Sequence, residues 1–112
     1  MHVPSLARHA ICAVASSVAL AAAAEADPKQ SLRFVEEFAG NCTARSGVQI
    51  LVQNTHPTRT VRVWLDRYHM GTGTGDRSRS DLAPGAPPEP LGCSRTTDGP
   101  QEWRVVRAVF ID

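Results

Sequence analysis

The side chains of this chain that could do metal chemistry together are His56, His69 and Met70. Imidazole nitrogens and a thioether sulfur are ligands that suit copper. His69 and Met70 are adjacent, so on an extended strand their side chains would point to opposite faces. The sequence therefore offers copper binding as an alternative function. The simpler interpretation is one histidine in a turn and one at the end of a strand.

A catalytic set would have to use the same histidines. Either could act as a general base, Asp66 could orient His69, and hydroxyls are available at Ser46, Ser78 and Ser80. The sequence has no nucleophile-elbow motif, and a domain of this size leaves little room for a deep pocket. We therefore expect a protein that is not an enzyme and holds no cofactor.

A glycine-rich segment, residues 71–76, alternates glycine with threonine and ends in aspartate. Such a loop cradles phosphate when it joins a strand to the start of a helix. No helical pattern follows it here, and the lysine of a phosphate-binding loop is absent from the motif. We interpret residues 70–80 as a polar, mobile loop. Residues 77–82 could hold a short strand.

A partner-binding surface is predicted from alternation along residues 60–68. One face of that predicted strand would carry Arg62, Trp64, Asp66 and Tyr68. Aromatic and arginine side chains dominate binding hot spots. In the alternative interpretation, Trp64 packs into the core of a second sheet. The net charge of +1 lacks the basic excess of a nucleic-acid-binding domain, so we expect a protein partner and no nucleic acid.

The first 26 residues read as an export signal. Arg8 supplies a basic start, an apolar stretch covers residues 11–24, and small residues suited to cleavage occupy 21–26. The apolar stretch is too short to span a bilayer comfortably. We predict a cleavable Sec-type signal peptide over residues 1–26, a periplasmic or secreted location, and no stable membrane span after cleavage.

Two cysteines, Cys42 and Cys93, follow the predicted signal peptide, while Cys12 lies within it. An oxidising compartment favours a disulfide between such a pair. Closing a loop of about 50 residues would stabilise the fold by roughly 4 kcal/mol. Two free thiols or a pair of metal or redox ligands are the alternatives, although the wide separation argues against a redox motif. Residues 27–112 are then a single disulfide-stapled domain.

Residues 28–39 allow two interpretations. Asp27 followed by Pro28 resembles the start of a helix, with Gln30 three positions after the cap. Apolar residues at 32, 35 and 39 could share one helical face, whereas residues 32–35 would also suit an edge strand. We expect a short helix here.

The rest of the chain reads as short strands. We predict strands at 48–53 and 60–68, paired as an antiparallel hairpin, and a prolonged extended segment through the prolines at 84–90. Residues 91–93 should re-enter a sheet. Residues 103–111 are apolar on both faces, which predicts a central strand. One of these faces carries Trp103, Val105, Arg107, Val109 and Ile111.

Five or six such strands joined by proline and glycine turns predict a mainly β fold. We expect a small antiparallel β-sandwich, immunoglobulin-like in outline, with a short N-terminal helix. Such an outline carries no function by itself. The predicted function is therefore a small exported, non-catalytic binding or accessory module that acts through a protein partner.

Overall fold

The computed structural model describes residues 27–112, so the predicted signal peptide, residues 1–26, lies outside the described residues. A one-turn 3-10 helix η2 (Pro28–Ser31), strand β1 (Leu32–Glu37) and a short helix α2 (Gly40–Thr43) come first. Five strands follow: β2 (Gln49–Asn54), β3 (Val61–His69), β4 (Thr72–Leu82), β5 (Glu89–Cys93) and β6 (Gln101–Phe110). Within these residues, no helix is long and apolar enough to cross a bilayer.

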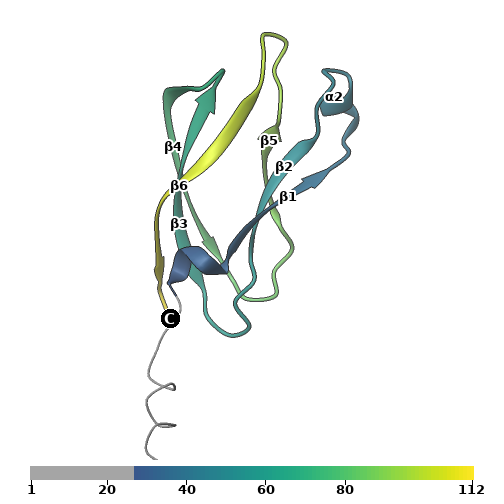
Figure 1. Ribbon diagram of the computed structural model, residues 1–112. Helices are drawn as coiled ribbons and strands as arrows, with labels where there is room; N and C mark the ends of the chain where they lie inside the picture. Colours follow the sequence, from purple (N-terminus) through teal and green to yellow (C-terminus); the bar gives the residue numbers. More distant parts are fainter. Residues whose placement is uncertain (1–26) are drawn as a thin grey trace, which may run out of the picture.

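The fold is mainly β, as predicted, and its strands form two three-stranded antiparallel sheets. One sheet has the order β1-β2-β5 and the other has the order β4-β3-β6 (Figure 1). Both sheets contribute to one core, in which Val52 of β2 meets Val63 and Leu65 of β3 and Leu82 of β4. The predicted alternation of β3 sets this core, because Val63 and Leu65 are buried and their neighbours are partly exposed.

The expected N-terminal helix is wrong beyond its first turn, and the edge-strand interpretation is right. Asp27 does cap a helix, since its carboxylate accepts a hydrogen bond from the Lys29 amide at 2.9 Å. The helix ends at Ser31, however, and β1 runs antiparallel to β2 with Phe34 opposite Val52. A short helix makes few hydrogen bonds for the residues that it orders, so pairing with β2 is the more stable arrangement for residues 32–37.

The predicted hairpin is also wrong, although both of its strands form. β2 pairs with β1 and β5, whereas β3 pairs with β4 and β6. The chain crosses between the sheets at Asn54, which is only 4% exposed. Its side-chain amide donates to the carbonyl oxygens of Arg59 and Leu82, both at 2.8 Å, and its oxygen accepts from the His56 amide. These bonds hold the crossing open and prevent a tight turn.

The glycine-rich loop predicted for residues 70–80 is mostly strand. β4 begins at Thr72, and its turn is confined to Met70 and Gly71, which have φ values of 52° and 83°. Nearly all of β4 is exposed and it lies at the edge of its sheet. A polar, glycine-containing sequence is compatible with such a position, because only the backbone has to pair.

The strand predicted for residues 103–111 forms as β6, but it lies at a sheet edge and not at the centre. Its apolar residues occur on both faces because of a β-bulge. Trp64 pairs with Arg107 and Leu65 pairs with Val105, so Val106 has no cross-strand partner and is 39% exposed. Beyond the bulge, Arg107 lies on the face opposite to Val105, which corrects the predicted facing.

The disulfide between Cys42 and Cys93 forms as predicted. It joins α2 to the end of β5, with the two Cα atoms 5.2 Å apart. Both cysteines are buried, with exposed fractions of 1% and 6%. The bond therefore fixes the loop before β2 to the strand that completes the same sheet, and residues 91–93 re-enter that sheet as expected.

Candidate functional site

The candidate site is the outer face of the β4-β3-β6 sheet, meaning the side turned away from the shared core. The alternation of β3 places all four predicted partner-binding residues on this face. Each of them is partly exposed: Arg62, Trp64, Asp66 and Tyr68. Trp64 thus lies outside the buried core, contrary to the alternative interpretation of that residue.

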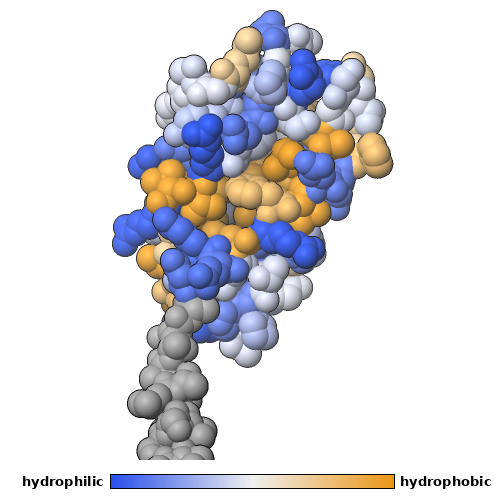
Figure 2. Space-filling model, viewed as in Figure 1, coloured by the Kyte–Doolittle hydropathy of each residue, from blue (hydrophilic) through white to orange (hydrophobic). Residues whose placement is uncertain are grey.

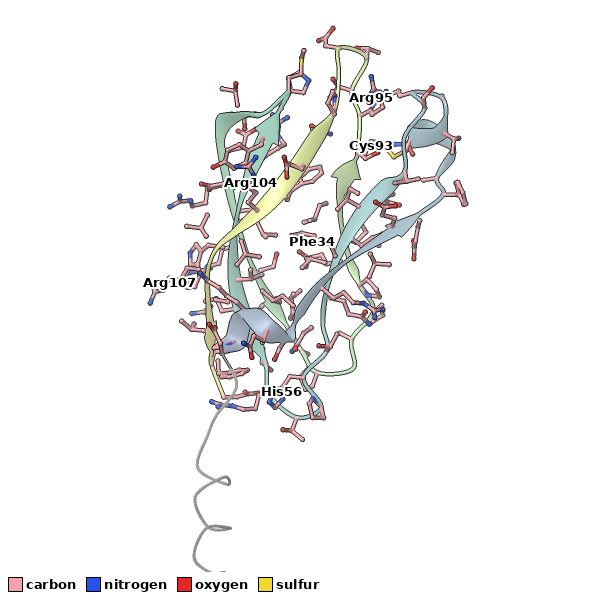
Figure 3. The ribbon with its side chains drawn as sticks, viewed as in Figure 1. Phe34, His56, Cys93, Arg95, Arg104 and Arg107 are labelled. Atoms are coloured by element: carbon pink, nitrogen blue, oxygen red, sulfur yellow. A yellow bond between two sulfur atoms is a disulfide. The ribbon has the colours of Figure 1, made fainter. Side chains whose placement is uncertain are left out.

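Both aromatic rings on this face are covered by a guanidinium group from β6. The Arg107 guanidinium carbon lies 4.8 Å from the centroid of the Trp64 ring, and that of Arg104 lies 3.8 Å from the centroid of Tyr68. Figure 3 shows both arginines on β6, on the side of the sheet away from β1 and β2. Such cation–π contacts favour this arrangement of rings and cations.

Two carboxylates on this face, those of Asp66 and Asp81, are each bound by an arginine of the neighbouring strand. Arg77 of β4 donates two hydrogen bonds to Asp66, at 2.6 and 2.9 Å. Arg62 likewise donates two to Asp81, at 2.7 and 3.0 Å. Because these donors favour the ionised carboxylates, they hold the pKa of Asp66 and of Asp81 below its usual value.

Positive charge exceeds negative charge on the outer face. The arginines there are Arg62, Arg77, Arg79, Arg104 and Arg107, against the three acidic residues Asp66, Asp81 and Glu102. Within residues 27–112, Arg79 and Arg107 form no salt bridge. Arg79 lies directly opposite Trp64 across the β3–β4 ladder. The centre of the face therefore combines an aromatic ring with two cations that form no salt bridge within the described residues.

Sequence reasoning missed the contribution of β6 to this face. Arg104 and Arg107 are three residues apart, so in a regular strand their side chains would point to opposite sides. The bulge at Val106 brings both to the same side. No pattern in the sequence announces that bulge, because Val106 is a good strand residue.

The three predicted copper ligands are not brought together. His56 precedes β3, where its Nδ1 accepts from the amides of Thr58 and Arg59. His69 ends β3 and its Nε2 pairs with the Thr96 hydroxyl at 2.9 Å. His56 lies before the start of β3 and His69 is its last residue, with Met70 directly after it. The two histidines are therefore at opposite ends of the strand, roughly 25 Å or more apart. In the described part of the chain, no three His, Cys, Asp or Glu residues form a metal-like cluster.

The Asp66–His69 pair considered for catalysis is also separated. Asp66 binds Arg77 on the outer face, while His69 binds Thr96.

A cavity of about 330 Å³ opens between β4 and β5, lined by Arg67, Ser80, Glu89 and Trp103 among others. Several of its polar groups bind one another: the Ser80 hydroxyl donates to the Glu89 carboxylate, and Arg67 donates to Asp76 and Gln101.

Comparison with known proteins adds no relative, since the chain matches no protein-family model, no curated protein and no solved structure.

Proposed function

We propose that this protein is a small exported, non-catalytic binding module that captures a protein partner on the outer face of its β4-β3-β6 sheet. One observation carries the proposal. The partly exposed rings of Trp64 and Tyr68 lie in one row, each under an arginine of β6. Aromatic and arginine side chains that are already held in place lose little conformational freedom when a partner docks.

The charges of the face indicate the chemistry of the partner. Arg79 and Arg107 flank Trp64 without a salt bridge of their own within residues 27–112. A partner surface that presents carboxylates around an apolar centre would pair with both cations and cover the ring. Complementary charge of this kind speeds association and selects among partners.

The two sheets and the disulfide also bear on the architecture of the protein and on its location. We infer that the two sheets form a small sandwich, immunoglobulin-like in outline, in the periplasm or outside the cell. The shared core of Val52, Val63 and Leu65 supports the sandwich. The Cys42–Cys93 disulfide is compatible with an oxidising compartment, as is the signal peptide predicted for residues 1–26.

The test is partner capture by the native, disulfide-intact protein in its exported fraction, followed by an affinity measurement with the partner recovered. Arg79→Glu should weaken binding by tenfold or more, because it replaces an attraction by a repulsion beside Trp64. Arg79 is exposed and forms no salt bridge within the described residues, so its substitution should leave the melting temperature unchanged.

Arg95→Glu is the matched control, since Arg95 is also exposed but follows β5, in the other sheet (Figure 3). Trp64→Ala should reduce capture at least as strongly as Arg79→Glu. If both outer-face variants bind the partner as tightly as the unchanged protein does, the proposed surface is wrong.

A further inference from the structure

The free edge of the other sheet, formed by β1, presents unpaired backbone groups. β1 is the outermost strand of the β1-β2-β5 sheet, and no other strand of residues 27–112 lies beyond it (Figure 1). The Thr55 amide donates to the Ser31 carbonyl at 2.7 Å, which fixes the phase of the β1–β2 ladder. In that phase the backbone groups of Arg33 and Val35 point toward β2, and those of Phe34 and Glu36 point outward.

Apolar side chains are exposed along the same edge. Phe34 is 41% exposed and Phe38, just after β1, is 88% exposed. Figure 2 shows a band of apolar surface across this side of the molecule, bordered by hydrophilic residues, and Figure 3 shows Phe34 between the two sheets. Contiguous apolar surface of this kind is typical of an interaction site.

The charges on the outward face of β1 are arranged symmetrically about Val35. Arg33 and Glu37 lie two residues before and two residues after it, so all three share one face. Their neighbours on β2 are the neutral residues Gln53 and Gln49. Within residues 27–112, neither Arg33 nor Glu37 forms a salt bridge. Each charge is thus free to meet an opposite charge on another strand.

We propose that β1 pairs with β1 of a second copy of this chain, antiparallel and with its two-fold axis at Val35. Arg33 of each copy then lies opposite Glu37 of the other, and the two Val35 side chains meet on the axis. Phe34 and Glu36 exchange backbone hydrogen bonds across the new ladder, because their backbone groups point outward. The β1-β2-β5 sheets of the two copies then form one continuous six-stranded sheet.

Side-chain register selects this arrangement over its nearest competitor. A two-fold axis at Phe34 would also satisfy the backbone, but it would place Arg33 opposite Val35 and leave Glu37 without a cation. With the axis at Val35, Phe38 of one copy comes opposite Leu32 of the other, so the most exposed phenyl ring gains an apolar neighbour. Charged residues usually protect an edge strand from pairing. Here their order makes the edge complementary to itself.

The test is the mass of the protein in solution, measured by sedimentation equilibrium across a wide concentration range at low salt. The interface is one short strand pair, so we expect a reversible dimer whose average mass approaches twice that of the chain as concentration rises. Glu37→Arg should raise the dissociation constant by about tenfold or more, because two opposite-charge pairs become two like-charge pairs. Arg33→Glu should do the same.

The double variant Arg33→Glu/Glu37→Arg restores both pairs with the signs exchanged, so its dissociation constant should return close to the original. Arg95→Glu, just after β5 at the opposite edge of the same sheet, is the control and should leave dimerisation unchanged. These side chains are exposed, so circular dichroism should show the fold intact in every variant. A protein that stays monomeric at every concentration overturns the proposal, as does a dimer that the single charge reversals do not weaken.

Discussion

The Cys42–Cys93 disulfide closes a long loop of the chain, and its removal gives a sharp prediction. The two cysteines are 51 residues apart in the sequence. Closing a loop of that length in the unfolded chain costs about 14 cal/mol/K of entropy, which corresponds to about 4 kcal/mol at 25 °C. Small domains have a free energy of unfolding of about 5–15 kcal/mol at most, so the loss should leave the fold marginal.

Two measurements separate the cross-link from the packing of its sulfur atoms. Urea denaturation of the oxidised protein should be compared with that of the reduced protein, which keeps both sulfurs, and with that of Cys42→Ala/Cys93→Ala. We expect the reduced protein to lose about 4 kcal/mol. The double variant should lose somewhat more, because Cys42 and Cys93 are buried and truncation leaves a cavity. A loss below about 1 kcal/mol on reduction would refute the loop-entropy reasoning.

Three further predictions follow from other contacts. The arginine clamps that lower the pKa of Asp66 and Asp81 stabilise the fold above the ordinary carboxyl pKa. The urea midpoint should therefore fall as the pH drops below about 4, and Asp→Asn variants at these positions should flatten that fall. Gly92→Ala should destabilise the fold by about 1–3 kcal/mol in urea denaturation, because the new Cβ would lie 2.8 Å from Cη2 of Trp103. His69→Ala should leave copper uptake, measured by calorimetry, unchanged, since the structure separates the predicted ligands. A stoichiometric loss of uptake in this variant would support copper binding as the function of the protein.

The strands that the sequence predicts best are those with one buried face. Along β3, valine and leucine alternate with polar and aromatic residues, and that alternation correctly places Val63 and Leu65 inside and Trp64 outside. The disulfide was predictable for a different reason, because the compartment implied by residues 1–26 favours oxidation. In both cases a local feature of the chain is sufficient.

Which strand pairs with which could not be predicted, because it depends on contacts far along the sequence. The sequence of residues 49–54 and 61–69 is typical of a hairpin. The buried side chain of Asn54 instead donates to the carbonyls of Arg59 and Leu82, and the chain passes to the other sheet. β4 is comparable: the sequence indicates a short strand only over residues 77–82, and the glycine-rich residues before them become strand through pairing with β3. Edge strands obtain their conformation from a neighbour, so their own side chains report little about it.

The candidate binding face shows the same limit at a single residue. A regular β6 would place Arg107 with Trp103 and Val105 on the core side, where a charge would need a partner. The bulge at Val106 allows Trp103 and Val105 to pack against the core while Arg104 and Arg107 both reach the outer face. One extra residue in the strand therefore satisfies the core and also supplies the cations above Trp64 and Tyr68. A reading with a strict period of two could find the aromatic row on β3, but it could not find the arginines that cover it.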